Sequence, residues 1–367
     1  MIRVLHIMGC SDVGGISTVV LNYYKYINRD EIHFDIALKT EGIGRNSKEI
    51  ISLGAKVYFL PLKSKNPVKF AKELAKILKN EKYDIVHDHE GVTSFFALSI
   101  AKYYKIPVRI AHTHSAARPI SLRGKCKRLV GTLLDDIVCT KFFACGYKAG
   151  CETFGMKIAN SSKIELLPNA IDINRFKFNQ IVRDQMRSMF NITDRYVVGM
   201  VGRLSPEKNH LFALNIVKKI HEYFPNIYLL IVGDGELKKT ICDIIRNESM
   251  ESYVEMLGVR NDISELNQAF DIAILPSLSE GFPVSAVESM ASGLPIVMSD
   301  AITKELSFGE DVNYCSLNDK EKWISYIMKY AHDENRVNRD SKLEEHGLDI
   351  KKNAIILEHH YKNNLKR

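Results

Sequence analysis

The sequence lacks long hydrophobic runs, which argues against a membrane-spanning protein. No apolar stretch approaches the roughly 18 residues that a transmembrane helix requires. The first eight residues also lack the basic region, the extended apolar core and the cleavage site of a secretory signal. We therefore expect a cytoplasmic protein.

Paired cysteine motifs are absent as well. The seven cysteines are scattered, and no two form a Cys-x-x-Cys pair, so neither a zinc site nor a disulfide framework is expected and the thiols should be reduced. The chain contains no Gly-x-Ser-x-Gly nucleophile elbow and no Gly-x-Gly-x-x-Gly dinucleotide fingerprint. These absences exclude the usual serine hydrolase and dehydrogenase signatures.

Acidic residues are missing between Glu90 and Asp135, although the formal net charge of the whole chain is only +7. Eight basic residues fall within this region: Lys102, Lys105, Arg109, Arg118, Arg123, Lys125, Lys127 and Arg128. The region is either an ordinary solvated surface or a patch that contacts an anionic membrane or an anionic lipid-linked acceptor at the inner face of the membrane. Nucleic acid is not expected as a partner, because no binding motif accompanies the charge.

The length of 367 residues exceeds what one ordinary core accommodates and indicates two domains. Strand-like apolar runs alternate with helical patterns, which predicts a parallel α/β architecture. In the first half we expect strands at residues 3–8, 34–38, 56–60, 85–89, 108–112 and 141–145, with helices at 16–27, 67–79 and 94–104. In the second half we expect strands at 196–201, 228–232, 254–257, 272–275 and 295–298, with helices at 210–223, 236–247 and 284–292.

The two series predict two Rossmann-like, doubly wound domains with a ligand cleft at the carboxyl ends of their strands. We place an N-terminal domain at residues 1–176, a C-terminal domain at 177–345 and a terminal helical segment at 346–367.

Glu280 and Glu288 flank the most informative stretch. Glu280 follows a short apolar strand, whereas Glu288 falls inside the next predicted helix, for which Pro283 suits the first position. The free N–H groups at a helix start attract phosphate. An anion site with a carboxylate on either side suits a nucleotide-sugar, although both acids could also be solvent-exposed.

Two cations, Arg203 and Lys208, follow the strand at 196–201 across a proline-containing loop. They could converge on one anion and stabilise a departing diphosphate, or they could be surface cations with carboxylate partners. Gly14 and Gly15 lie between the first strand and a helix, where glycine permits close approach of a ligand to the backbone.

His112 and His114 stand at the end of a predicted strand, where a spacing of two puts both on one side. A neutral imidazole there could bond a sugar hydroxyl or transfer a proton, or it could be structural. Metal binding by this pair would require further ligands, and the sequence identifies none.

The assembled motifs resemble the GT-B fold, retaining glycosyltransferases of family four (group 1). Four blocks in order carry the resemblance: residues 202–208 (GRLSPEK), 229–236 (LLIVGDGE), 276–283 (PSLSEGFP) and 288–295 (ESMASGLP). The resemblance implies two Rossmann-like domains that face a central cleft. The N-terminal domain would bind the acceptor, the C-terminal domain would bind the donor, and the C-terminal helix would cross back to the N-terminal domain.

The resemblance also implies roles for residues of the C-terminal domain. Arg203 and Lys208 would bind the diphosphate, Glu280 would bond hydroxyls of the donor sugar, and Glu288 would bond the ribose. The segment Gly281, Phe282, Pro283 and Val284 would offer backbone contacts to sugar and phosphate. Val259 and Arg260 fall where this family contacts the base.

In the N-terminal domain, Gly14 and Gly15 match the family's glycine-rich loop, and Asn169 matches an asparagine of its interdomain segment. The family's histidine at the end of a strand corresponds to His112 or His114, with a slight preference for His112. The implied reaction is retaining and requires no metal ion and no cofactor beyond a UDP-sugar donor.

The opening segment and the residues around His112 look like those of bacterial capsule and exopolysaccharide transferases. The main hypothesis is therefore transfer of a sugar from a nucleotide-sugar to a glycan or a lipid-diphosphate-linked saccharide. Two alternatives remain open at this point: a non-hydrolysing nucleotide-sugar epimerase, and a non-catalytic nucleotide-binding subunit of a polysaccharide assembly complex.

Overall fold

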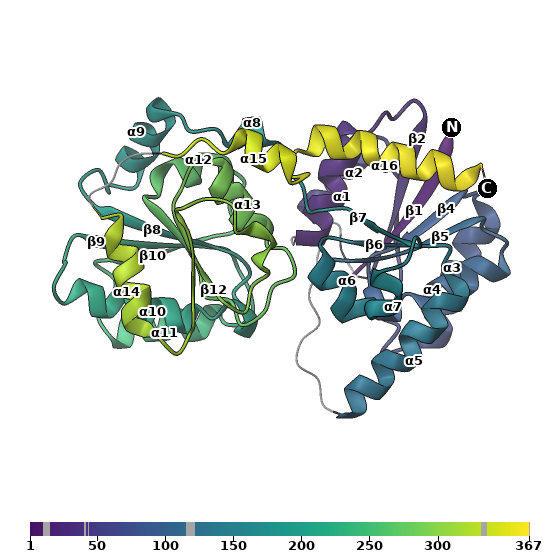
Figure 1. The fold of residues 1–367 in the computed structure, drawn as a ribbon, viewed down its shortest axis with the longest axis horizontal. Helices are drawn as coiled ribbons and strands as arrows, with labels where there is room; N and C mark the ends of the chain where they lie inside the picture. The colour runs from purple at the N-terminus through teal and green to yellow at the C-terminus, as the bar shows by residue number, and fades with distance from the viewer. Residues whose placement is uncertain (10–14, 40–41, 43, 115–121, 332–335, 367) are drawn as a thin grey trace. The chain divides into compact units, whose positions relative to one another are not determined.

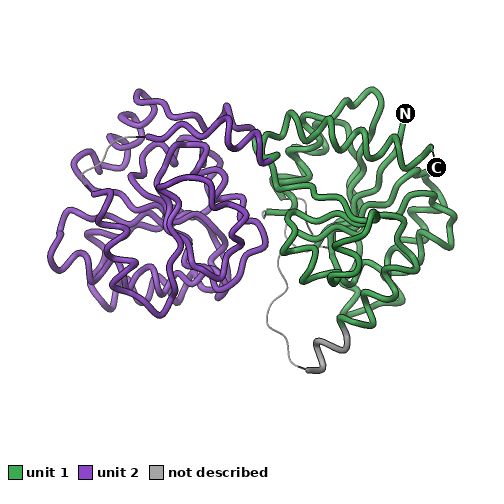
Figure 2. The backbone as a smooth tube through the Cα atoms, viewed as in Figure 1, with its two compact units in different colours: residues 1–171, 347–367 green, residues 172–346 purple. Residues whose placement is uncertain are grey.

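The computed structural model describes residues 1–9, 15–39, 42, 44–114, 122–331 and 336–366, with the backbone alone for 122–127. The chain divides into two compact units (Figures 1 and 2). Unit 1 comprises residues 1–171 and 347–367, and unit 2 comprises residues 172–346. The predicted boundaries lay at residues 176 and 345. Among the helices that the structure describes, none combines the length and the apolar character that crossing a bilayer takes.

Unit 1 contains a seven-stranded parallel sheet in the order β3-β2-β1-β4-β5-β6-β7. Its elements are β1 (Ile2–Met8), α1 (Gly15–Tyr26), β2 (Ile32–Leu38), α2 (Arg45–Ser52), β3 (Val57–Phe59), α3 (Pro67–Asn80), β4 (Ile85–Asp88), the 3-10 turn η1 (Gly91–Thr93), α4 (Phe95–Tyr103), β5 (Val108–Thr113), α5 (Leu122–Val138), β6 (Lys141–Ala144), α6 (Tyr147–Phe154), α7 (Met156–Ala159), β7 (Ile164–Leu166) and α16 (Ile350–Leu365).

Helix α16 completes unit 1 although it follows the whole of unit 2 in the sequence. It packs beside α1, as Figure 1 shows in yellow and purple. Its Tyr361 is fully buried and hydrogen-bonds Nδ1 of His87 at 2.7 Å. Asn353 is also buried and donates to Tyr23 on α1. The return of the last helix is thus fixed by buried polar contacts as well as by packing.

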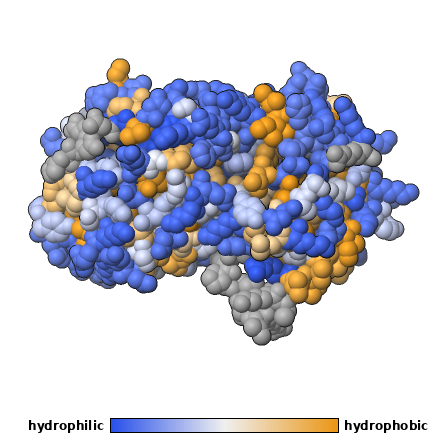
Figure 3. Space-filling view, viewed as in Figure 1, coloured by the Kyte–Doolittle hydropathy of each residue, from blue (hydrophilic) through white to orange (hydrophobic). Residues whose placement is uncertain are grey.

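Helix α5 presents an unusual apolar surface. Leu129, Leu133 and Ile137 repeat at every fourth residue and are 63%, 58% and 65% exposed, and Val130 and Leu134 extend the same stripe. The opposite side carries Asp135, which is fully buried. In Figure 3 apolar residues gather where α5 lies in Figure 1. An amphipathic helix normally buries its apolar face, so this arrangement is inverted.

Unit 2 contains a six-stranded parallel sheet in the order β10-β9-β8-β11-β12-β13. Its elements are α8 (Ile173–Phe176), α9 (Gln180–Met189), β8 (Tyr196–Val201), η2 (Pro206–Lys208), α10 (His210–His221), β9 (Ile227–Val232), α11 (Lys238–Asn247), β10 (Val254–Gly258), α12 (Ile263–Ala269), β11 (Ile272–Leu275), α13 (Val284–Ala291), β12 (Ile296–Ser299), η3 (Lys304–Leu306), β13 (Val312–Cys315), α14 (Lys320–Lys329) and α15 (Asp340–Glu345).

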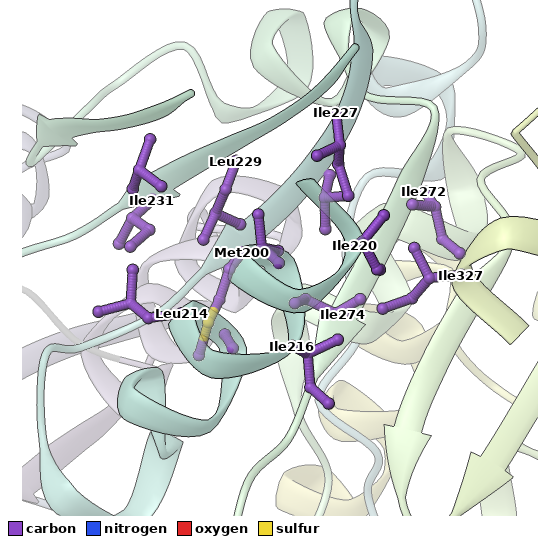
Figure 4. Packing of buried hydrophobic residues seen from close by; sticks show 14 of the residues in the cluster. Met200, Leu214, Ile216, Ile220, Ile227, Leu229, Ile231, Ile272, Ile274 and Ile327 are labelled. Atoms are coloured by element: carbon purple, nitrogen blue, oxygen red, sulfur yellow. The ribbon is translucent and has the colours of Figure 1, made fainter. Parts of the chain in front are cut away.

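The core of unit 2 forms where α10, α11 and α14 pack on the sheet (Figure 4). Met200, Leu229 and Ile274 from three neighbouring strands meet Ile220 of α10 and Ile327 of α14. These strands read as continuous apolar runs because a sheet covered on both faces buries both sides of each strand.

The structure confirms the predicted α/β class with two doubly wound parallel sheets. In both sheets the strand order reverses between neighbours, at β1 and β4 in unit 1 and at β8 and β11 in unit 2. Ligands of open α/β sheets bind at such a reversal, beyond the carboxyl ends of the strands. The five cysteines with described side chains are all free thiols.

Candidate functional site

A lysine–glutamate pair lies at the strand-order reversal of unit 2. Lys208 ends the short η2 turn after β8, and Glu280 lies in the loop after β11, the neighbouring strand. The Lys208 ammonium forms an ion pair with Oε1 of Glu280, which also accepts a hydrogen bond of 3.1 Å from the hydroxyl of Ser277. The two side chains are 21% and 16% exposed, so the pair remains accessible to a ligand.

Backbone contacts hold the two loops together. The N–H of Leu278 donates to the carbonyl of Glu207 at 2.8 Å, and Glu280 forms a parallel bridge with Ile302. The left-handed conformation of Asn209, at φ 58°, ends the η2 turn and directs the chain into α10. Lys208 and Glu280 are far apart in the sequence, and they meet because β8 and β11 are neighbours in the sheet.

Glycine is required where the β9–α11 loop crosses the β8–α10 loop. A Cβ on Gly233 would lie 2.0 Å from the carbonyl oxygen of Gly202, and φ at Gly233 is +143°. A Cβ on Gly235 would lie 2.4 Å from the carbonyl oxygen of Leu204. These glycines support the loop that carries Lys208, since any side chain would separate the two backbones.

Helix α13 begins directly after the Glu280 loop. The sequence suggested Pro283 as its first residue, and this was wrong: Pro283 is the N-cap, with extended ψ of 116°, and the helix begins at Val284. Proline fits this position because the N-cap residue needs no N–H for the helix. Its carbonyl accepts a hydrogen bond of 3.1 Å from the N–H of Ala286. Gly281, Phe282 and Pro283 are all buried.

Glu288 lies on α13, one turn after its start. Its residue surface is partly exposed, yet the carboxyl is surrounded by protein, and this desolvation raises its pKa to about 7. The guanidinium of Arg175 opposes this rise. Arg175 belongs to α8 and bonds the hydroxyl of Ser264 at 3.1 Å and the carbonyl of Asn261. Glu288 is thus a carboxyl that can take or release a proton near neutral pH.

Sequence reasoning missed Arg175 and a second residue, His210. His210 is the first residue of α10 and is fully buried, and neither ring nitrogen has a hydrogen-bond partner. Burial and the charge of Lys208 lower its pKa to about 4. Its position two residues after Lys208 was visible in the sequence, but its burial was not.

Three of the predicted donor residues have surroundings that differ from those of the Lys208–Glu280 pair. Arg203 pairs with Glu236 at 3.7 Å, and both side chains are more than half exposed. Val259 is 51% exposed after β10. Arg260 bonds Asp262 at 2.9 and 2.5 Å. The structure therefore gives Arg203 and Lys208 different carboxylate partners instead of joining them on one anion.

In unit 1 the predicted His112 and His114 belong to a larger cluster that the sequence analysis did not find. Their rings lie 4.0 Å apart, and His6, His87 and His89 complete the group. All five are buried, at 1% to 9% exposure. Burial lowers the pKa of every member, to about 3 for His6 and about 4 for His114, so the cluster is neutral at physiological pH.

A signal for this cluster was present in the sequence. Histidines occur within β1 and within or directly after β4 and β5, and these three strands are adjacent in the sheet. The spacing of two in His87 and His89 repeats that of His112 and His114. Knowledge of the strand order would have brought all of them together.

Asn169 is connected to this cluster. Its buried side-chain carbonyl accepts from Nδ1 of His114 at 2.9 Å. Gly15 is the exposed first residue of α1, whereas Gly14 lies outside the described residues, as does Arg118 of the basic stretch. The side chains of Arg123, Lys125 and Lys127 also lie outside the described part of the structure.

Unit 2 offers groups that suit an anion and hydroxyl groups. A partly accessible ammonium and the first N–H groups of α13 attract negative charge, and Glu280 and Glu288 supply acceptors for hydroxyls. The buried imidazoles of unit 1 offer neutral nitrogen atoms.

Comparison with known proteins extends these observations. The family model described as Glycosyltransferase Family 4 matches residues 13–175, and the model described as Glycosyl transferases group 1 matches residues 182–347. The Bacillus subtilis (strain 168) protein named "Putative glycosyltransferase EpsF" is 32% identical over 312 residues, which cover 84% of this chain and 81% of that protein. The Escherichia coli UDP-Gal:alpha-D-GlcNAc-diphosphoundecaprenol alpha-1,3-galactosyltransferase is 27% identical over 289 residues, which cover 76% of this chain and 74% of that enzyme.

Solved structures share the fold. The crystal structure of Anabaena Alr3699/HepE in complex with UDP matches with a TM-score of 0.77 and 18% identity over 99% of this chain and 100% of that chain. The apo form of the lipopolysaccharide outer core galactosyltransferase WaaB matches with a TM-score of 0.65 and 16% identity over 98% of this chain and 100% of that chain. These likenesses confirm the predicted GT-B class of two Rossmann-like units.

Proposed function

This chain belongs to the family 4 (group 1) glycosyltransferases, and we propose that it moves a sugar from a UDP-sugar to a hydroxyl of a lipid-linked saccharide with retention of configuration. The single observation that carries the donor assignment is the Lys208–Glu280 pair at the strand-order reversal of unit 2, beside the start of α13. The UDP complex of the HepE structure and the UDP-Gal donor of the E. coli relative support UDP as the nucleotide.

In this proposal Lys208 exchanges partners when the donor binds. The ammonium turns from Glu280 to the diphosphate, and the freed Glu280 oxygen accepts hydroxyls of the donor sugar. As the bond between sugar and diphosphate breaks, negative charge grows on the leaving group. A fixed cation and the N–H groups of α13 then stabilise the transition state more than the ground state. Because protein groups meet this charge, the transfer requires no divalent cation.

The remaining predicted donor residues keep their proposed roles. Arg203 leaves its exposed partner Glu236 to reach the diphosphate, and Glu288 bonds the ribose. Gly281, Phe282, Pro283 and Val284 approach the sugar and phosphate through their backbone, and Val259 and Arg260 flank the base. In unit 1, His112, His114 and Asn169 are buried polar residues, and Asn169 bonds His114.

A donor screen followed by product analysis tests this proposal. At a hundredfold excess over Kd, the true donor should stabilise the protein by about 2.7 kcal/mol. Lys208→Ala should reduce kcat by about 10²–10³-fold, as the loss of a comparable oxyanion contact does. The matched control is Lys239→Ala, which removes an exposed lysine that pairs with Asp243. NMR of the product should show the donor's anomeric configuration.

Other results would contradict the proposal in distinct ways. Conversion of the donor sugar without any acceptor would indicate an epimerase. Donor binding without turnover across lipid-linked and free saccharide acceptors would indicate a non-catalytic subunit. An inverted anomeric centre would refute retention alone.

The acceptor side of the proposal rests on α5. Its exposed Leu129, Leu133 and Ile137 could insert among acyl chains, while Lys102, Lys105 and Arg128 add positive charge in the same region of the sequence. The acceptor named for the E. coli relative is linked to diphosphoundecaprenol, an anionic lipid. We therefore propose that unit 1 contacts the cytoplasmic face of an anionic membrane during polysaccharide assembly.

Vesicle co-sedimentation tests the membrane contact. The wild type should bind vesicles that contain phosphatidylglycerol, and the Leu133→Ser/Ile137→Ser double variant should bind at least tenfold more weakly. The control is Ile355→Ser, which changes a 58% exposed residue of α16. Equal binding by all three proteins would refute the role of α5.

A further inference from the structure

The five buried histidines of unit 1 form two hydrogen-bonded chains. In the first, Nδ1 of His6 meets Nε2 of His89 at 2.9 Å, and Nδ1 of His89 meets Nε2 of His114 at 2.7 Å. In the second, Nδ1 of His112 meets Nε2 of His87 at 3.1 Å. These contacts join the carboxyl ends of β1, β4 and β5.

Hydrogen bonds within these chains leave two ring nitrogens without a partner. A neutral imidazole carries one N–H and one lone pair. Because Asn169 accepts from Nδ1 of His114, Nε2 of His114 must accept from His89, and His89 must then accept from His6. Nε2 of His6 and Nε2 of His112 are left buried without a partner. A buried nitrogen without a partner destabilises the fold.

Three of the histidines have the arrangement of a ligand set. His89, His112 and His114 each offer one ring nitrogen, and these atoms lie within 4.8 Å of one another. The other nitrogen of each ring has an outer partner: His89 contacts His6, His112 contacts His87, and His114 contacts Asn169. Metal-binding histidines characteristically use their second nitrogen in this way, since the outer bond fixes tautomer and orientation.

We propose that His89, His112 and His114 form a binding site for one divalent transition-metal ion of the zinc class, with the fourth coordination position open. Three neutral imidazoles suit Zn²⁺, Co²⁺, Ni²⁺ and Cu²⁺ better than Mg²⁺ or Ca²⁺, which prefer oxygen ligands. Nε2 of His112 gains a partner on metal binding. The 2.7 Å contact between His89 and His114 opens to the roughly 3.3 Å that tetrahedral ligation at about 2.05 Å requires.

A second set, His6, His87 and His89, also places one nitrogen of each ring within 4.8 Å of the others. It is the weaker choice because the hydrogen-bond partner of His6 is His89, a member of the same set, so that His6 lacks the outer bond that each ring of the first set has. His89 belongs to both sets, so its substitution removes either site.

Zinc binding to the full chain tests the proposal without any assay of transfer. After exposure to Zn²⁺ and gel filtration, elemental analysis should find one zinc per chain in the wild type and in His359→Gln, which changes an exposed histidine of α16. His89→Gln should bind at least 100-fold more weakly by calorimetry. Co²⁺ in place of zinc should give the intense visible absorption of a four- or five-coordinate site, which His89→Gln should lack.

Asn169→Ala provides a second test that leaves all three ligands in place. Loss of an outer hydrogen bond typically weakens metal affinity 10- to 100-fold, so zinc should still bind, but less tightly. This variant decides the matter if circular dichroism shows that His89→Gln does not fold. The proposal is overturned if the wild type takes up no zinc in a saturable manner, or if His89→Gln and Asn169→Ala both bind it as the wild type does. In the first of these cases the five imidazoles are a neutral hydrogen-bonded network only.

Discussion

Replacing Glu288 with glutamine should stabilise the protein at alkaline pH while it weakens nucleotide binding. The Glu288 carboxyl has a pKa of about 7 because burial disfavours its charged form, whereas its ordinary value is 4.5. The folded protein therefore holds this proton more tightly than the unfolded chain does. Between about pH 4.5 and pH 7 the unfolded chain loses this proton while the folded protein keeps it, so the stability falls as pH rises. Above pH 7 the full penalty applies.

The size of the effect follows from the pKa change. Each unit of pKa corresponds to about 1.4 kcal/mol, so the change from 4.5 to about 7 sets an upper limit of about 3–4 kcal/mol. Relaxation and water penetration around the buried charge reduce this penalty, and about 1–2 kcal/mol is expected. For a unit of this size, that corresponds to a rise in Tm of roughly 2–8 °C.

Calorimetry of the full chain at pH 4.5 and pH 8 measures this prediction. Glu288→Gln should unfold at a higher temperature than the wild type at pH 8 and at nearly the same temperature at pH 4.5. Its affinity for UDP should fall at pH 8, because glutamine cannot supply an ionised acceptor to the ribose. Glu251→Gln, at an exposed position, is the control. A destabilised Glu288→Gln protein, or a difference that is equal at both pH values, would refute the reasoning.

Two further substitutions test the support of the donor unit. Gly233→Ala should destabilise the protein by about 3 kcal/mol, measured by thermal unfolding, because the new Cβ would lie 2.0 Å from the Gly202 carbonyl oxygen; Gly9→Ala, with open space around it, should change little. Asp271→Asn should lower the free energy of unfolding by about 3–5 kcal/mol in denaturant titration, because Arg183 and Arg187 would lose their charged partner. Wild-type stability in either variant would contradict the structural account.

The regular elements with strong hydrophobic patterns were predictable from the sequence. The strands at Tyr196–Val201 and Ile272–Leu275 have the predicted bounds because they are continuous apolar runs. Helix α9 was missed because Gln180–Met189 is mostly polar and carries Arg183 and Arg187 toward Asp271. Strand β13 was missed because Val312–Cys315 is short and alternates polar and apolar residues at the sheet edge.

The candidate sites were predictable only in part, because they depend on strand order. Lys208 and Glu280 were identified separately, and their ion pair forms because β8 and β11 are neighbours. His6, His87 and His89 stayed hidden inside apolar strands. Their grouping exists only in three dimensions, where burial lowers the pKa of all five imidazoles.

The return of α16 to unit 1 gives the chain a particular order of assembly. A ribosome delivers all of unit 2 as one continuous segment, and that segment can close its core as soon as it emerges. Unit 1 cannot complete its core until residues 347–367 have been synthesised. These include Tyr361, which bonds His87 of the histidine cluster. A chain cut short before α16 would thus contain a complete unit 2 and an incomplete unit 1, in which His87 lacks its bond to Tyr361.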